Sequence, residues 1–248
     1  GLYDPCAYFE KLQARFHRTD TESRLSPDDA ARPLPILVEK ILQRDESLPD
    51  DWPVDGTTGY EVGVHLRGLW VDPEAEAALT QTYQKFAGDL RSFSEHEYEC
   101  KRYVVRYVLM SELNVLAQAA HRIARGNRHF RDFTLLGLTH ASTELVCALP
   151  VYRTYVRPGK SVPERAERIV RSAARLARLR NPAHSASVYA FLSDLLLLRL
   201  EGSEEQRRCR AAFALRFQEL TGPIMANAAE GTAFYRYSRL ICRNAVGD

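Results

Sequence analysis

Glu39 is the residue of this chain whose type and place most clearly suit chemistry. It directly follows a short apolar run, Leu34–Val38, and precedes a long polar loop. The run is typical of a fully buried strand in a parallel sheet, so we expect Glu39 at the carboxyl end of that strand. In α/β folds, ligands bind outside the carboxyl ends of the strands, where the loops carry the chemistry. Glu39 is therefore the first candidate for a chemical role.

The loop after Glu39 holds the side-chain types that a sugar-binding site needs. Sugar hydroxyls bind carboxylates and hydroxyls, and the faces of sugar rings pack on aromatic side chains. The loop residues of these types are Trp52, Asp55, Thr57, Thr58 and Tyr60. A structural interpretation stays open beside this one, in which Glu39 only ends a strand and is paired with Lys40 or a nearby arginine.

Composition argues against several other classes of function. The 248 residues can bury a substantial core, in one large domain or two small ones. The 34 Lys and Arg residues nearly balance the 32 Asp and Glu residues, so no strong net field favours nucleic acid or an anionic membrane. The five cysteines are widely spaced and form no CxxC pair, which indicates reduced core thiols in a cytoplasmic protein. The histidines show no metal-ligand spacing, and we expect no metal and no cofactor.

Hydrophobic periodicity predicts a mostly helical chain with few strands. The clearest helix is expected over Glu95–Arg125, where apolar residues recur at spacings of three and four and Ser92 or Ser94 can cap the start. Other helices are expected from Asp4-Pro5, over Thr58–Arg67, from Asp72, and over Phe133–Leu149 (capped by Asp132), Pro163–Arg180, Ala186–Leu200, Glu204–Glu219 and Thr232–Arg243. Strands are expected at Leu34–Val38, Val151–Val156 and Ile224–Ala226, and a polar connector or short exposed helix at His17–Pro33.

Four blocks of sequence, in order along the chain, resemble the maltooligosyl trehalose synthases of the α-amylase superfamily. GLYDP at residues 1–5 is similar to the end of the segment that carries the family's catalytic nucleophile. VEKIL and DWPVDGTTGY, within residues 38–60, resemble the family's acid/base segment. LPVYRTYV at residues 149–156 and RFQELTGPIMANAAEGTAFYRY at residues 216–237 resemble two later blocks. The resemblance therefore runs from the first residue nearly to the last.

With this resemblance, the expected fold is mainly α: a helical insertion with a few βα units cut from a (β/α)8 barrel. Three buried strands cannot close a sheet of eight, so a self-contained barrel is excluded. We expect a partial barrel segment with the acid/base loop at 1–60 and the first part of the helical insertion at 61–149. A strand and helical subdomain would follow at 150–221, and a partial barrel strand and helix at 222–248.

The resemblance implies an intramolecular transglucosylation, which is an isomerisation. The family turns the α-1,4 link at the reducing end of a maltooligosaccharide into an α,α-1,1 link, giving a trehalose end. A retaining glycosyl transfer needs two carboxyl groups about 5–5.5 Å apart, one as nucleophile and one as acid/base. By resemblance, Glu39 is the acid/base. The freed glucose must turn and attack through its anomeric hydroxyl while water is kept out.

The resemblance also implies substrate contacts. Those in the first loop, which would bind glucose hydroxyls, wall the acceptor subsite or stack on a sugar ring, are Trp52, Asp55, Thr57, Thr58 and Tyr60. In the VYRTYV block, Tyr152, Arg153 and Tyr155 would face the substrate channel or pack the barrel. The residues that match the last block are Glu230, Phe234, Tyr235 and Arg236. Among these we expect Glu230 above all to touch sugar, whereas Arg153 has an equal claim to a structural role.

Two departures from the family pattern bear on activity. Where the family's last block reads close to MAKGxEDTAFYRY, this chain has Asn227 for Lys, Ala228 for Gly and Gly231 for Asp. Loss of a cation and a carboxylate is expected to weaken binding or distort the site. By resemblance, the nucleophile Asp lies before Gly1 and a third catalytic Asp beyond Asp248, so we expect the chain by itself to be inactive.

A second class of function stays open, a non-catalytic helical module that contacts carbohydrate or serves as a scaffold. The departures in the last block favour it slightly, whereas the intact VEKIL and DGTTGY blocks favour descent from a working enzyme. The partner expected for the full enzyme is a maltooligosaccharide, with no nucleic acid and no membrane. Exposed strand edges make homodimer formation a further expectation.

Overall fold

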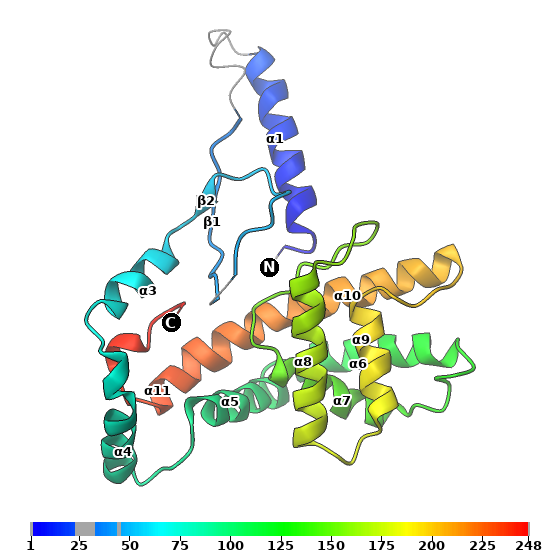
Figure 1. The fold of residues 1–248 in the computed structure, drawn as a ribbon. Coiled ribbons are helices and arrows are strands. Elements are labelled where there is room, and N and C mark those ends of the chain that lie inside the picture. Colours follow the sequence, from blue (N-terminus) through cyan, green and yellow to red (C-terminus); the bar gives the residue numbers. More distant parts are fainter. Residues whose placement is uncertain (1, 23–32, 44–45, 248) are drawn as a thin grey trace. The chain divides into compact units, whose positions relative to one another are not determined.

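The computed structural model describes residues 2–22, 33–43 and 46–247, which form two compact units (Figure 1). The terminal unit comprises Leu2–Thr82 and Leu240–Asp248, and the helical unit comprises Tyr83–Arg239. Most of the described chain is helical, which confirms the mainly α fold class. Its description as a piece of an eight-stranded barrel and its four-part division stay predictions. Gly1 of the GLYDP block and residues 23–32 of the expected connector lie outside the described residues.

The terminal unit begins with helix α1, Pro5–Glu22. The Asp4 carboxylate accepts a hydrogen bond from the backbone N–H of Ala7 (3.1 Å), so the predicted cap at Asp4-Pro5 is confirmed. Farther along α1, Nε2 of Gln13 donates to the carbonyl oxygens of Leu34 (2.8 Å) and Pro53 (3.2 Å). One side chain of α1 therefore holds the two loop segments that lead into the strands.

Two short strands, β1 at Leu37–Val38 and β2 at Gly56–Thr57, pair in parallel. The predicted buried strand Leu34–Val38 is therefore wrong in length and in burial, because Leu37 is 65% exposed although Val38 is buried. Among the described residues β1 has one neighbouring strand, so it gains neither a second ladder nor a cover on its open face. The strand pair still brings the residues after Val38 beside the loop after Thr57.

Further helical elements follow in the terminal unit. They are α3 (Tyr60–Gly68), the 3₁₀ turns Pro73–Ala75 and Ile241–Arg243, and the first part of α4 (Glu76–Ala87). Gly59 precedes α3 with φ 93°, a left-handed conformation that favours glycine. The Asp72 side chain accepts from the backbone N–H of Glu74 (2.9 Å), so the helix start predicted at Asp72 is confirmed.

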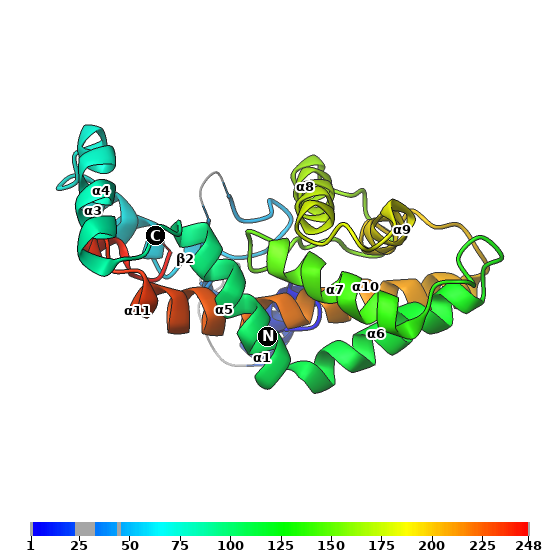
Figure 2. The ribbon, with the colours of Figure 1, turned by 90° about the horizontal axis from the view of Figure 1, so that it is seen from below.

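The helical unit packs around one hydrophobic core. Its elements are α5 (Phe93–Tyr107), α6 (Met110–Arg125), α7 (Leu135–Ala148), α8 (Glu164–Arg180), α9 (Ala186–Leu196), α10 (Glu204–Met225), a π-helix (Ala226–Ala233) and α11 (Phe234–Arg236). Helix α7 packs on α5, α6, α8 and α9 and is therefore central (Figure 2). Its cap is Thr134, whose hydroxyl accepts from Gly137 N–H (3.0 Å), and not the predicted Asp132.

The long helix predicted over Glu95–Arg125 is in fact two helices, α5 and α6. At the junction, the backbone N–H groups of Val108 and Leu109 both bond to the carbonyl of Val104 (2.9 and 3.0 Å), which closes α5. Apolar residues on both helices contribute to the same core, so their spacing continues across the break and gives no sign of it. The predicted cap at Ser92 is confirmed by a reciprocal capping box with Glu95.

The strand predicted at Ile224–Ala226 is also wrong, and the helix predicted over Thr232–Arg243 is too long, because regular helix ends at Arg236. Helix α10 continues through Pro223 to Met225 and passes into the π-helix without a strand. The carbonyl of Pro223 accepts from the Asn227 side chain (2.8 Å), and the carbonyl of Asn227 accepts from the Thr232 hydroxyl (2.7 Å). These side-chain bonds supply partners along the altered helical path, which the pair Gly222-Pro223 did not suggest.

Residues 151–156 form an irregular segment in place of the predicted strand. Two of its carbonyl groups are bonded by side chains of α10: the Thr221 hydroxyl donates to Tyr152 O (2.6 Å), and Gln218 Nε2 donates to Val156 O (2.9 Å). Tyr155 has φ 58°, a left-handed value that interrupts extended backbone. The apolar residues of this segment are buried as predicted, but against helices and not in a sheet.

Three of the five cysteines are buried, and two are exposed. Cys6, Cys100 and Cys147 are core thiols as expected, whereas Cys209 and Cys242 are exposed, and none of these five described cysteines forms a disulfide. Within the described ranges, no helix is both long and apolar enough to cross a membrane. Nor do the described residues place three or more His, Cys, Asp or Glu side chains where they could hold a metal ion.

Candidate functional site

The Glu39 carboxylate lies directly after β1 and turns toward the loop that follows β2. The Tyr60 hydroxyl donates a hydrogen bond to Glu39 Oε1 (3.0 Å). The strands create this meeting, because their parallel register pairs Val38 with Thr57 and sets both loops at the same end. Two residues that sequence reasoning assigned to one site, 21 positions apart, are thereby brought into contact.

Lys40 does not neutralise Glu39, so the structural interpretation of a Glu39–Lys40 pair is not supported. Lys40 points to Glu46, with Nζ 2.7 Å from Oε2 and both side chains buried. Glu46 Oε2 also accepts from the backbone N–H of Gln43 (2.9 Å), which fixes the segment after Glu39. The Glu39 side chain is exposed, and no described residue forms an ion pair with it. One of its carboxylate oxygens is thus open to a ligand.

The two threonines of the loop have different positions. The Thr57 hydroxyl donates to Glu61 Oε1 (2.5 Å) and accepts from Gly59 N–H (3.1 Å). This hydrogen bond from Thr57 holds the pKa of the Glu61 carboxyl below its usual value. Thr58 is exposed, with its backbone N–H bonded to Val38 O (3.1 Å). Glu61 is a residue that sequence reasoning missed, although its place four residues after Thr57 at a helix start was a usable signal.

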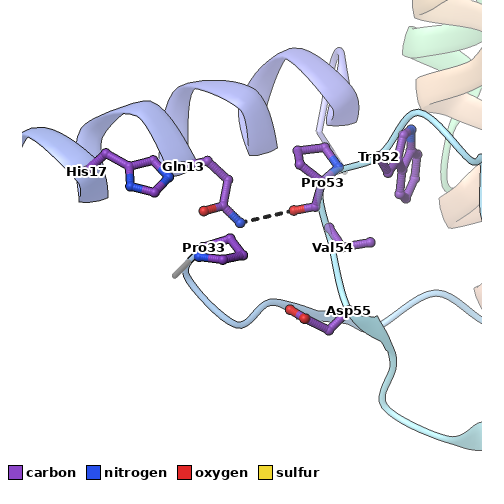
Figure 3. A pocket seen from close by; sticks show the side chains of 7 residues that line it. All are labelled: Gln13, His17, Pro33, Trp52, Pro53, Val54 and Asp55. Carbon is purple, nitrogen blue, oxygen red and sulfur yellow. Dashed lines mark hydrogen bonds between the residues drawn. The ribbon is translucent and has the colours of Figure 1, made fainter. Parts of the chain in front are cut away.

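Asp55 and Trp52 line a cavity of about 390 Å³ in the terminal unit, beside α1 (Figure 3). Asp55 Oδ2 accepts from the backbone N–H of Ile36 (2.6 Å), so this carboxylate also braces the strand pair. Trp52 packs on Phe9 with ring centroids 5.3 Å apart and is 8% exposed. Little of the indole remains for stacking, so the structure gives Trp52 a packing role and its stacking on sugar stays a prediction.

A second Tyr–Glu pair lies in the helical unit. The Tyr152 hydroxyl donates to Glu230 Oε1 and joins the irregular segment 151–156 to the π-helix. Burial raises the pKa of Glu230 above its usual value, and the bond from Tyr152 offsets this only in part. Tyr152 is itself held through its backbone carbonyl by Thr221. Thr221 and Gln218 are further residues that sequence reasoning missed, because nothing local shows that α10 passes beside this segment.

The other predicted residues of the helical unit have contacts of their own. Arg153 is buried, with its guanidinium carbon 5.6 Å from the centre of the Tyr155 ring. Phe234 stacks on Phe93 of α5 (5.6 Å between centroids) and thus has a packing role. Tyr235 is 86% exposed. Burial raises the pKa of the Cys100 thiol, and the nearby Arg236 lowers it by less.

The known proteins that are similar to this chain share one name. No family model matches the chain. A curated protein of Mycobacterium tuberculosis, assigned by name to the maltooligosyl trehalose synthases, is 26% identical over 252 residues, covering 100% of this chain and 27% of that protein. The solved maltooligosyltrehalose synthase of Arthrobacter ramosus is 31% identical with a TM-score of 0.74, covering 99% of this chain and 27% of that one. This chain resembles a segment of maltooligosyl trehalose synthase.

The resemblance inferred from the four sequence blocks is thereby confirmed over the whole chain. A Sulfolobus tokodaii structure, named as a hypothetical maltooligosyl trehalose synthase, matches 100% of the chain at 22% identity with a TM-score of 0.66, which supports the fold alone. In these comparisons the chain spans about a quarter of the length of its relatives (27% of the Arthrobacter enzyme). The activity of the whole maltooligosyl trehalose synthases therefore cannot be transferred to this chain by similarity alone.

Proposed function

We propose that this chain supplies the acid/base segment of a maltooligosyl trehalose synthase. The reaction would convert the reducing-end α-1,4 link of a maltooligosaccharide into an α,α-1,1 link. The observation that carries the proposal is the hydrogen bond from Tyr60 to Glu39 (3.0 Å), which unites the acid/base segment with the DGTTGY loop. Similarity to the Arthrobacter ramosus enzyme along 99% of the chain supports it.

Glu39 would act first as acid and then as base. As an acid it would protonate the oxygen of the broken α-1,4 link, so that the terminal glucose leaves. It would then take the proton of the anomeric hydroxyl as that glucose attacks the glycosyl-enzyme. The Tyr60 hydroxyl fixes one carboxylate oxygen and leaves the other for the substrate. A second carboxyl group, the nucleophile, is required for the covalent intermediate.

The loop around Glu39 is proposed to bind the glucose unit that turns. Thr58 presents an exposed side chain at the start of α3, and Thr57 is oriented by Glu61 (2.5 Å). Hydroxyl and carboxylate groups of this kind can exchange hydrogen bonds with several sugar hydroxyls in turn, which suits a sugar that must rotate without leaving. Glu230 with Tyr152 is proposed as a further contact to sugar hydroxyls.

The test is replacement of Glu39 in the polypeptide encoded by the complete reading frame that contains this sequence. With maltopentaose as substrate, we expect a non-reducing product, measured as the loss of reducing ends. Glu39→Gln removes the transferable proton but keeps the shape, so kcat should fall roughly 10²- to 10⁴-fold. A variant that keeps more than a tenth of the activity would show that Glu39 is not the acid/base.

The matched control is Glu74→Gln, which makes the same chemical change at an exposed position of the same unit. It should leave kcat and KM unchanged. The 248 residues expressed alone should give no product, because sequence reasoning assigns to this segment one of the two carboxyl groups that the reaction needs. Product formation by the isolated chain would disprove that assignment.

One observation favours the alternative of a non-catalytic module. Asn227 stands where the family has Lys, and its side-chain amide donates to the Pro223 carbonyl (2.8 Å). An amide used within the helix leaves the last block without the family's cation. If the complete protein folds and binds maltopentaose but forms no product, the scaffold or carbohydrate-contacting role would be the better proposal.

A further inference from the structure

A groove of about 410 Å³ runs between α6 and α10 in the helical unit. The two helices lie side by side there (Figure 2). The groove is lined by the C-terminal half of α6 and the N-terminal half of α10, whereas Glu230 lies beyond the other end of α10. It therefore belongs to a different part of the molecule from the Tyr152–Glu230 pair.

A buried cation is the first notable feature of this groove. Arg210 is 4% exposed, and its Nη1 donates to the carbonyls of Leu200 (2.6 Å) and Glu201 (2.5 Å). Its Nε is buried and has no hydrogen-bond partner among the described residues. The described residues place no carboxylate at ion-pair distance from it. A buried guanidinium without a counter-ion is unfavourable, so an anion bound beside Arg210 would be stabilised by it.

Two more arginines increase the positive charge of the groove. Arg122 on α6 and Arg216 on α10 are exposed at its lining, and neither guanidinium group bonds to a described residue. The lining holds one carboxylate, that of Glu205, against three guanidinium groups. The excess of two positive charges matches a dianion. Guanidinium groups also fit phosphate oxygens in shape and in donor geometry.

The rest of the lining is apolar and includes Ile123 and Phe213. A volume of 410 Å³ lies within the range of pockets that hold small organic ligands, roughly 300–1,000 Å³. We propose that this groove binds a small organic phosphate monoester, with its dianionic head on the three arginines and its apolar body between α6 and α10. At neutral pH a phosphate monoester carries close to two negative charges.

Cys209 offers a direct test on the full 248-residue chain, because it is exposed and lines the groove. Phenyl phosphate is the probe, and alkylation by iodoacetamide at Cys209 is followed by peptide mass spectrometry. The rate at Cys209 should fall as the groove fills, while the rate at Cys242, also exposed but in the terminal unit, should not change. Equal rates at Cys209 with and without millimolar phenyl phosphate would overturn the proposal.

Variants separate the contributions of charge and apolar surface. Arg122→Gln and Arg216→Gln should each weaken the protection by phenyl phosphate roughly tenfold, since each loses one charged hydrogen-bonding partner. Arg178→Gln makes the same change on the exposed face of α8 and should have no effect. The side chains of Arg122 and Arg216 are exposed and bond to no described residue, so these variants should fold, which circular dichroism checks. If Arg178→Gln lost as much protection by phenyl phosphate, the effect would come from the overall charge of the protein, and the proposed site would be overturned.

Two companion probes complete the test. Inorganic phosphate lacks the apolar body and should protect Cys209 at least tenfold less well than phenyl phosphate, and phenol lacks the charge and should not protect at all. Equal protection by inorganic phosphate would overturn the organic part of the proposal. Equal protection by phenol would overturn the anionic part.

Discussion

The two units present the same chemical pair, a tyrosine hydroxyl donating to a glutamate, on very different supports. In the terminal unit, Tyr60 meets Glu39 at the end of a two-residue strand, and the carboxylate is exposed. In the helical unit, Tyr152 meets Glu230 beside a core of packed helices, where burial raises the pKa of Glu230. The pair itself is a poor guide to role, and its surroundings decide whether the carboxylate is open to a ligand or embedded in the packing.

The surroundings of the two Tyr–Glu pairs differ because the two units are stabilised by different kinds of contact. The helical unit has a deep core in which Phe191 contacts the rings of Phe130 (4.7 Å) and Phe133 (5.6 Å). The terminal unit depends on single polar contacts, such as the hydrogen bonds of Gln13 and the buried Lys40–Glu46 pair. We expect changes in the core to act through packing and changes at the loop to act through individual bonds.

The largest expected effect is in the core of the helical unit. Phe191→Ala leaves a cavity where the side chain was 1% exposed, so the free energy of unfolding should fall by about 3–5 kcal/mol. Urea denaturation followed by circular dichroism measures this. Phe86→Ala, at a residue 92% exposed, is the matched control and should change stability by less than about 0.5 kcal/mol. Similar losses in both variants would contradict the deep core described here.

A smaller effect is expected where α10 holds the Tyr152 segment. Thr221→Val keeps the shape but removes the hydroxyl that donates to Tyr152 O, leaving a carbonyl without that donor. The free energy of unfolding should fall by about 1–3 kcal/mol. Thr139→Val is the control, because the Thr139 hydroxyl donates only to Leu135 O within its own helix (2.9 Å). If the two variants lose equal stability, Thr221 has no special part in placing Tyr152.

The pH dependence of stability should carry opposite signs in the two units. Burial raises the pKa of Glu230 in the folded protein, so the native state holds this proton more tightly than the unfolded chain. Its contribution to stability is fully present below the usual pKa of 4.5 and is lost as pH rises through the raised value. Glu230→Gln should abolish that decline. Unfolding midpoints measured in steps above pH 4.5 would show it, and an unchanged profile would refute it.

Glu61 should give the reverse effect. The hydrogen bond from Thr57 lowers its pKa, so its contribution is present above the usual value of 4.5 and is lost as pH falls through the lowered one. Glu61→Gln should therefore flatten the acid side of the stability profile. Thr57→Val should do the same, because it removes the hydroxyl that holds the carboxylate. A variant of either kind with the original acid profile would contradict this cause.

Sequence reasoning predicted the helices well and the strands poorly, for physical reasons. Helix starts at Asp4, Asp72 and Ser92 are decided by side chains next to them in the chain, and each was found. The end of a helix inside a continuous apolar pattern is not decided by neighbouring side chains in this way. The break at residues 108–109 was therefore missed. Segment 151–156 has the composition of a strand, yet α10 side chains bond two of its carbonyls. Composition cannot tell which kind of partner a buried backbone will meet.

The candidate site shows the same division. The contact between Glu39 and Tyr60 could be anticipated because the strand and the loop follow each other in the chain. The bond between Tyr152 and Glu230 spans 78 positions and depends on the path of α10 through Pro223. The family resemblance named both residues but could not say that they touch. Glu61, which neither approach named, came to light only through its bond to Thr57.

Because of the π-helix at Ala226–Ala233, the orientation of the side chains that follow depends on the number of residues after Pro223. Its widened turns accommodate surplus length, and in an α-helix each residue advances the chain by about 100°. Deleting one residue here would let the coil tighten, and every following side chain would swing by about that angle. Phe234 would leave its place on Phe93, and Tyr237 would leave the ring of Tyr83 that it meets at 5.0 Å. A change of length at this point would therefore disturb the molecule more than most changes of residue type.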